Sequence, residues 1–171
     1  DEIIVTATRS STQLSKTPIA MSAITGDSLR DAGITDPTLL QETVPNLSID
    51  RNNGLQITIR GISSSDGSEK GDPSAAFMLD GIYIARPQAQ EVSFFDIERV
   101  EVLRGPQGTL FGKNTIGGAI NVVTRAPEGD TRYSAELTAG EFSHKGLDAY
   151  AEFPITDNLA GSVSVLWKQS D

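Results

Sequence analysis

A glycine-rich stretch at positions 105–118 contains the residues whose spacing most suggests a chemical role. Its sequence is GPQGTLFGKNTIGG. A phosphate-binding loop uses the backbone N–H groups of such a stretch, followed by a lysine and a hydroxyl residue, to hold a nucleotide. That pattern needs glycine where Gln107 stands, and it needs serine or threonine where Asn114 follows Lys113. The spacing therefore argues against a nucleotide site.

An acidic loop offers a second candidate for chemistry. Asp66, Ser68 and Lys70 occupy alternating positions, as the first ligands of a calcium loop do. Lysine cannot ligate a cation, however, and Phe77 stands at the twelfth position, where such a loop supplies a bidentate glutamate. We therefore predict no metal site and no resident cofactor.

Catalytic groups are equally hard to assemble. His144 is the only histidine and lies in a polar turn, and the chain contains no cysteine. Glu98 and Glu101 are separated by an odd spacing on one predicted strand, so they should point to opposite faces and cannot act as a carboxylate pair. The sequence predicts no catalytic residue and gives no argument for an enzyme.

The composition indicates a folded, acidic protein. Its 171 residues are 37% hydrophobic and 22% charged, a balance typical of a globular chain, and the net charge is −9. A nucleic-acid-binding surface needs a basic patch, which this charge balance argues against. No apolar run approaches the ~20 residues of a membrane-spanning helix. Barrel strands of about 10 alternating residues would leave no such run.

The residues up to Pro127 predict an α+β unit that follows an extended tail over residues 1–17. Thr25 is placed to cap a short helix, and Asp36 is placed to cap a second one that begins at Pro37. Strands are expected where apolar residues alternate or run together, with a tight hairpin turn inside one pair. They cover 19–24, 56–60, 75–79, 82–84, 97–103 and 119–124.

Beyond Pro127 the pattern changes to strict alternation, with runs of about 8–10 residues that predict three consecutive antiparallel strands. Alternation fits either a meander on a soluble core or strands with one side against lipid. A sheet that stops after three strands has open edges, so we expect further strands to continue it.

Four segments in this order carry a family resemblance: DEIIVTA at 1–7, ITIRGI at 57–62, FMLDGIYI at 77–84 and IERVEVLRGPQGTLFGKNTIGGAINVVTRAP at 97–127. Together they resemble the plug domain of TonB-dependent receptors. The strands after them resemble the start of that family's 22-stranded transmembrane β-barrel. For these strands the resemblance implies one side toward lipid (Leu137, Phe153, Val163, Val165) and the other toward the lumen (Glu136, Asp148, Glu152). The resemblance implies a TonB box and extended linker over 1–17, an α+β plug with a small mixed sheet over 18–127, and the first three barrel strands over 128–171.

The resemblance also assigns roles to individual residues. The segment Asp1, Glu2, Ile3, Ile4, Val5, Thr6 and Ala7 matches the TonB box, to which the periplasmic partner TonB binds by strand addition. Arg60 and Arg104, each followed by a glycine, match arginines that pair with glutamates on the inner barrel wall. Two apical loops would contact the substrate through Asp66, Lys70, Asp72, Arg86 and Gln88.

The function implied by the resemblance is energy-coupled uptake of a scarce nutrient, such as a ferric siderophore, across the outer membrane of a Gram-negative bacterium. The plug would sit inside the barrel lumen, and the barrel would contact outer-membrane lipid. Two alternatives stay open at this point. One is a signalling or surface-binding receptor of the same fold that does not import, and the other is a soluble secreted α+β enzyme.

Overall fold

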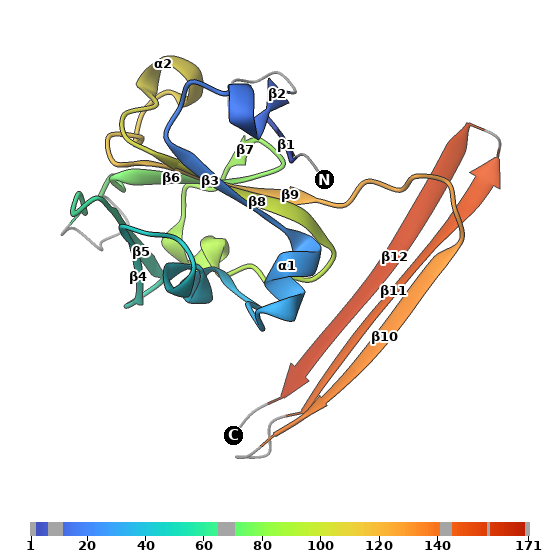
Figure 1. Ribbon diagram of the computed structural model, residues 1–171. Coiled ribbons are helices and arrows are strands. Elements are labelled where there is room, and N and C mark those ends of the chain that lie inside the picture. Colours follow the sequence, from blue (N-terminus) through green and yellow to red (C-terminus); the bar gives the residue numbers. More distant parts are fainter. Residues whose placement is uncertain (1–2, 7–11, 65–70, 141–144, 157, 170–171) are drawn as a thin grey trace. The chain divides into compact units, whose positions relative to one another are not determined.

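The computed structural model describes residues 3–6, 12–64, 71–140, 145–156 and 158–169. The chain divides into two compact units, Asp1–Thr124 and Arg125–Asp171, coloured from blue to orange-yellow and from orange to red (Figure 1). Each unit contains sheets of its own.

A five-stranded mixed sheet, in the order β3-β8-β9-β6-β7, forms the centre of the first unit. Strands β6 and β9 run parallel and all other neighbours run antiparallel, which confirms the predicted small mixed sheet. Asp80 and Gly81 have φ values of 51° and 77°, as the tight turn between β6 and β7 requires. The strands are β3 (Met21–Thr25), β6 (Ala75–Leu79), β7 (Ile82–Tyr83), β8 (Ile97–Arg104) and β9 (Gly118–Thr124).

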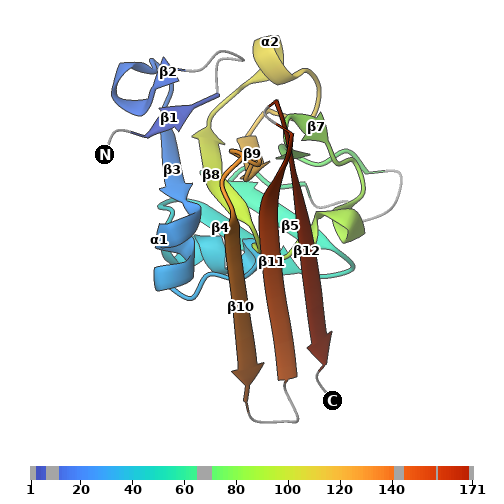
Figure 2. The same ribbon diagram turned by 90° about the vertical axis from the view of Figure 1, so that its right-hand side faces the viewer.

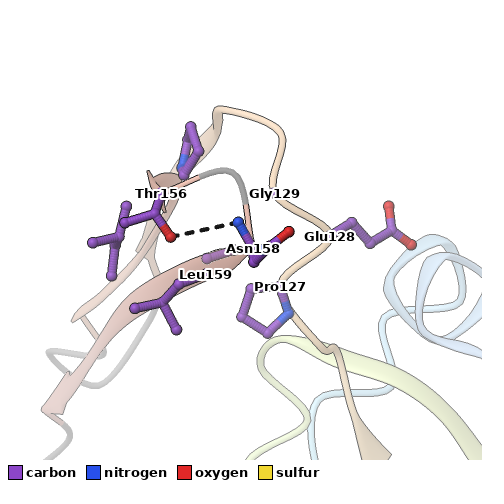
Figure 3. A pocket seen from close by; sticks show the side chains of 9 residues that line it. Pro127, Glu128, Gly129, Thr156, Asn158 and Leu159 are labelled. Carbon is purple, nitrogen blue, oxygen red and sulfur yellow. Dashed lines mark hydrogen bonds between the residues drawn. The ribbon is translucent and has the colours of Figure 1, made fainter.

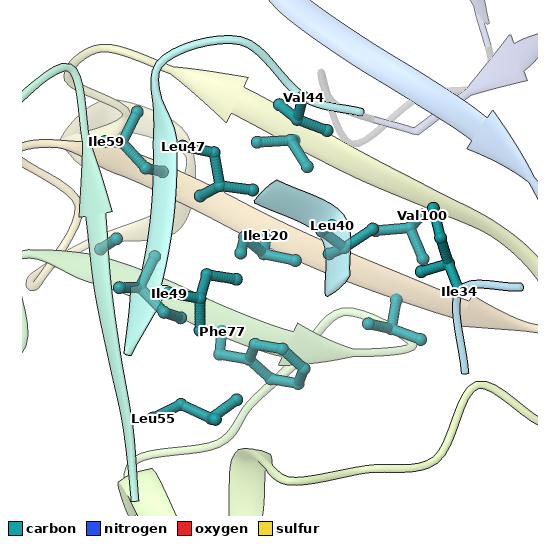
Figure 4. Packing of buried hydrophobic residues seen from close by; sticks show 14 of the residues in the cluster. Ile34, Leu40, Val44, Leu47, Ile49, Leu55, Ile59, Phe77, Val100 and Ile120 are labelled. Atoms are coloured by element: carbon teal, nitrogen blue, oxygen red, sulfur yellow. The ribbon is translucent and has the colours of Figure 1, made fainter. Parts of the chain in front are cut away.

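Apolar residues cover both faces of this sheet. On one face Val100, Ile120 and Phe77 are fully buried and belong to one large cluster (Figure 4). A hairpin of β4 (Leu47–Arg51) and β5 (Leu55–Ile59) adds its alternating apolar residues to that cluster. The other face holds a smaller cluster of Ala76, Met78, Leu103 and Ala119. Because both faces are covered, β8 is buried at nearly every position even though it carries Glu98, Arg99, Glu101 and Arg104.

Short capped helices connect the strands. Thr25 caps α1 (Gly26–Asp31), where its hydroxyl accepts a hydrogen bond from the Ser28 N–H at 3.2 Å, as predicted. The second predicted helix is a 3₁₀ helix, η2 (Pro37–Glu42), which ends with an i→i+3 hydrogen bond from the Thr43 N–H to the Leu40 carbonyl at 3.1 Å. No helix among the described residues is long and apolar enough to cross a membrane. The remaining helices are η1 (Leu14–Lys16), η3 (Pro87–Gln90) and α2 (Gly108–Phe111).

Within the described part of residues 1–17, where we expected an extended tail, two short strands pair with each other. Strand β1 (Ile4–Val5) pairs antiparallel with β2 (Thr12–Gln13), and η1 follows directly. Val5 is fully buried whereas Ile4 is 56% exposed. Burial of the apolar Val5 side chain stabilises this arrangement, because it removes apolar surface from water.

The second unit is a three-stranded antiparallel sheet, in the order β10-β11-β12, as the alternation predicts (Figure 2). Its strands are β10 (Arg132–Ala139), β11 (Lys145–Thr156) and β12 (Leu159–Gln169). The register shifts between Pro154 and Thr156. Proline cannot donate to a strand ladder, so an irregularity at that position is expected.

The register gives this sheet one apolar and one polar face. Leu137 stands opposite Leu147, which stands opposite Trp167, and Ala135, Ala149 and Val165 form the next row. Glu136, Asp148 and Leu166 form a row on the opposite face. Large apolar side chains remain exposed on the apolar face: Tyr133 (86%), Leu137 (82%), Val163 (57%) and Val165 (50%). An apolar face of this extent needs a non-aqueous or protein neighbour.

Candidate functional site

The N-terminal strand forms the first candidate site, because one of its edges pairs with no other described strand. The Ile3 carbonyl accepts a hydrogen bond from the Leu14 N–H at 2.9 Å. In an antiparallel pair, backbone groups of alternate residues turn toward the partner and away from it. Ile3 and Val5 therefore direct their N–H and C=O groups to β2, and those of Ile4 and Thr6 point away. Among the described strands, β1 pairs with β2 alone, so this outward edge is not part of a ladder.

A buried ion pair lies at the outward edge of β1. Glu101 of β8 is fully buried, and its Oε1 atom accepts hydrogen bonds from the Thr6 N–H at 2.8 Å and from the Thr6 hydroxyl at 3.1 Å. Arg99 donates from Nε to the same Oε1 atom at 2.8 Å. Arg99 also donates from Nη2 to the Thr6 hydroxyl at 3.3 Å. The coupling candidate and the central sheet are thus joined by one charged network.

The same guanidinium joins the two glutamates that we expected to be separate. Arg99 pairs with Glu98 through Nη1 and with Glu101 through Nε. The register of β8 against β9 shifts between Ile97 and Arg99, and such a bulge re-aims side chains that strict alternation would send to opposite faces. Sequence reasoning missed this network. The available signal was the pair of acids that flank an arginine inside a strand with otherwise apolar inner positions.

Of the two arginines expected to pair with the barrel wall, Arg60 lies beside the turn that follows Arg104. Arg60 has a φ of 54° and follows β5, and Arg104 ends β8 before Gly105, whose φ is 104°. Arg60 Nη1 lies 3.4 Å from the position that a Cβ atom at Gly105 would take. Within the described part of the chain neither guanidinium forms an ion pair or a side-chain hydrogen bond, and the buried Nε of Arg104 lacks a partner. Among the described residues, neither cation therefore has an anion to neutralise it.

The predicted substrate residues do not form one site in the described structure. The Asp72 carboxylate accepts a hydrogen bond from Asn114 Nδ2 at 3.1 Å and lies 3.6 Å from Lys113 Nζ, so it bonds to the loop after α2. Gln88 instead donates to the Asn53 carbonyl at 2.8 Å, in the turn between β4 and β5. Arg86 is exposed before η3. Two further predicted contacts, Asp66 and Lys70, lie outside the described residues, as do Asp1, Glu2 and Ala7 of the coupling segment.

A hollow of about 720 Å³ lies within the second unit, at the turn end of β11 and β12 (Figure 3). The Asn158 N–H donates to the Thr156 hydroxyl at 3.4 Å across that turn. Among the described residues that line the hollow, the one carboxylate is that of Glu128, which pairs with Arg132. Its lining residues are Pro127, Glu128, Gly129, Pro154, Ile155, Thr156, Asn158, Leu159 and Ala160.

Glu152 secures the chain where it enters the second sheet. This side chain is 1% exposed and accepts hydrogen bonds from the backbone N–H groups of Glu128 and Gly129, the latter at 3.0 Å. The Tyr150 hydroxyl donates to its second oxygen at 2.9 Å. Glu152, which we expected to face a lumen, thus has a structural role within its own unit.

Comparisons with known proteins agree on one family. The model of the TonB-dependent receptor plug domain matches residues 13–119. The pesticin receptor of Yersinia pestis is 33% identical over 99% of this chain and 25% of its own length. The vitamin B12 transporter BtuB of Vibrio vulnificus is 26% identical over 100% of this chain and 28% of its own length. The chain therefore spans about a quarter of these relatives.

Solved structures show the same similarity. The ferric yersiniabactin uptake receptor FyuA of Yersinia pestis matches with a TM-score of 0.80 and 30% identity, over 89% of this chain and 24% of that one. The ferripyoverdine receptor of Pseudomonas aeruginosa matches with a TM-score of 0.81 over 97% of this chain and 22% of that one, at 22% identity, which is a likeness of fold.

Proposed function

The chain belongs to the TonB-dependent receptor plug domain family, and from this premise we propose that it is the plug and barrel entry of an outer-membrane receptor that imports a scarce nutrient by energy coupling. The observation that carries the proposal is the outward edge of β1. It presents backbone groups of Ile4 and Thr6 away from β2, where a partner strand can add. We assign residues 1–7 as the segment that TonB binds from the periplasm.

The second unit fits a place in the membrane. We propose that residues 128–171 supply the first three strands of a 22-stranded barrel in the outer membrane, after a linker over 1–17 and a plug over 18–127 inside the lumen. The exposed apolar face of β10–β12 supports contact with outer-membrane lipid, since Tyr133, Leu137, Val163 and Val165 all lie on it. Further strands would cover the open edges of this sheet.

The proposed cargo is a ferric siderophore or a similar metal chelate. The names of two relatives refer to ferric yersiniabactin and ferripyoverdine, and that of a third to vitamin B12. We propose that Arg86 and Gln88 contact the cargo from one plug loop and Asp66, Lys70 and Asp72 from another. Among the described members of this set, Arg86 is the best suited, because it is an exposed cation and ferric siderophore complexes are commonly anionic.

We also assign Arg60 and Arg104 to the attachment of the plug inside the barrel. Neither arginine has a described anion as partner, and the buried Nε of Arg104 is left unsatisfied. Glutamates on the barrel wall would remove both costs at once. Such pairs hold a plug at rest and can be broken when the segment at 1–7 is pulled.

Membership of a family of transport receptors argues against the soluble enzyme alternative.

Import and mere surface binding differ in their energy requirement. Cells that express the intact receptor should accumulate iron from ferric yersiniabactin, used as the first probe, and accumulation should stop when the proton gradient is dissipated although surface binding continues. Surface binding of several ferric chelates without accumulation of any would favour the signalling receptor.

A further inference from the structure

Glu101 is buried in the central sheet, yet most of its hydrogen bonds are with Thr6, which directly follows β1 and lies outside that sheet. Two of its three donors belong to Thr6, at 2.8 and 3.1 Å, and one belongs to Arg99, at 2.8 Å. A buried carboxylate needs its donors, because an unsatisfied charged group carries the full cost of lost hydration. The hydrogen bonds of Thr6 therefore hold the N-terminal segment against β8. The same hydrogen bonds compensate Glu101 for the hydration that it loses on burial.

The Thr6 N–H that Glu101 accepts is part of the outward edge of β1. Ile3 turns its carbonyl to Leu14, so Thr6, three residues on, turns its backbone away from β2. A partner strand that adds to this edge needs the same N–H as a donor. Glu101 and a partner strand thus compete for one backbone group.

We propose that Glu101 is a latch that masks the coupling edge of β1, with Arg99 as the positioning residue that holds its carboxylate. The proposal rests on the assignment of residues 1–7 as the TonB-binding segment and adds the group that controls access to it. For the edge to become available, Thr6 must leave Oε1, and Arg99 must then neutralise Glu101 alone.

The charges around Glu101 determine which substitution the central sheet should tolerate. Glu98, Arg99 and Glu101 carry two negative charges and one positive charge, and Glu98 remains on Arg99 when Thr6 leaves. Replacing Glu101 with glutamine leaves a balanced Glu98–Arg99 pair, so the central sheet should tolerate the change. The glutamine keeps the size of the side chain but gives Thr6 a weaker, uncharged acceptor.

The test measures how often β1 opens. Val5 is fully buried and these 171 residues contain no cysteine, so a Val5→Cys thiol reports opening through its rate of labelling in the intact receptor. Glu101→Gln and Thr6→Val should each raise this rate on the order of tenfold, because each removes or weakens charge-assisted hydrogen bonds. Thr6→Ser, which keeps both donors, should label at the parental rate.

Glu98→Gln is the matched control. Glu98 lies on the same strand and bonds to the same guanidinium, but it is half-exposed and does not contact Thr6. It should leave labelling unchanged. Equal labelling of Thr6→Val, Thr6→Ser and the parent would overturn the latch, and Thr6→Val keeps the test open if Glu101→Gln fails to fold.

A separate measurement distinguishes failure of the latch from failure of the coupling assignment. A peptide of residues 1–7 should bind the periplasmic domain of TonB without the rest of the chain. If the peptide binds and the Thr6→Val labelling rate stays at the parental value, the latch is wrong and the assignment stands. If the peptide does not bind, the assignment fails, and with it the role of Glu101 in masking a TonB site.

Discussion

Replacing Arg104 with methionine should change plug stability with opposite signs in two forms of this protein. In the described chain the Nε atom of Arg104 is buried without a hydrogen-bond partner, and Arg60 Nη1 lies 3.4 Å from the Cβ position of the adjacent Gly105. A buried donor without a partner costs ~1–3 kcal/mol. Methionine retains an unbranched apolar chain and removes both this donor and one of the two like charges.

The expected sign depends on what surrounds the plug. In a fragment of residues 1–127, Arg104→Met should raise the free energy of unfolding by about 1 kcal/mol, the lower end of that range, because the side chain is only partly buried. In the intact receptor the same change would leave a wall glutamate buried without its cation, at a cost of roughly 3–5 kcal/mol where the pair is desolvated.

Urea unfolding of the fragment measures the first effect, which corresponds to a midpoint shift of roughly 0.3–1 M. Amide exchange of plug residues inside the intact receptor measures the second. Arg30→Met serves as control, since the Arg30 side chain is 64% exposed and should matter in neither form. Destabilisation of the fragment by Arg104→Met, or an unchanged plug in the receptor, would refute the reasoning that Arg104 awaits a partner beyond the plug.

The remaining predictions concern folding and packing. Amide exchange on the 171-residue chain should show protection concentrated before Pro127, since three strands with an exposed apolar face and open edges do not form a stable sheet alone; strong protection confined to 128–171 would contradict this. Gly105→Ala should lower the urea midpoint of the fragment, because alanine is strained at a φ of 104° and its Cβ would meet Arg60; an unchanged midpoint would show that this turn is free to relax. Thr25→Ala should cost about 1 kcal/mol through loss of the α1 cap, whereas Thr25→Ser should cost much less. Arg60→Lys should restore only part of the stability lost in Arg60→Ala within the receptor, as lysine cannot form a bidentate pair.

Much of the first unit was predictable because local rules and tertiary packing agree there. The Thr25 cap, the Asp80-Gly81 turn and the strand at 97–103 all follow from residue types that permit few other conformations. The second helix was predicted correctly in place but not in type, since a 3₁₀ helix differs from an α-helix in its backbone hydrogen-bond pattern, which the capping residues do not specify. The three strands after Pro127 followed from alternation alone.

The network at Glu101 was not predictable from spacing. Thr6 and Glu101 are 95 positions apart, and a bulge near Ile97 brings Glu98 to the same guanidinium as Glu101. Neither event leaves a periodic signal. For the predicted substrate residues the sequence suggests contacts with a ligand and does not reveal contacts within the protein. Asp72, for example, was predicted to contact the substrate, and its carboxylate accepts a hydrogen bond from Asn114. Pairing between polar residues that are distant in the sequence depends on the tertiary fold and leaves no local pattern.

Uptake by an Ile4→Pro receptor tests the central claim most directly. Proline removes the outward N–H of Ile4, which a partner strand needs, and leaves the backbone groups of Ile3 and Val5 that face β2. Cells that express this variant should bind a ferric chelate at their surface as the parent does but accumulate no iron, and Ile4→Val, which keeps the N–H, should accumulate it normally. Parental rates of iron accumulation by the proline variant would contradict the account.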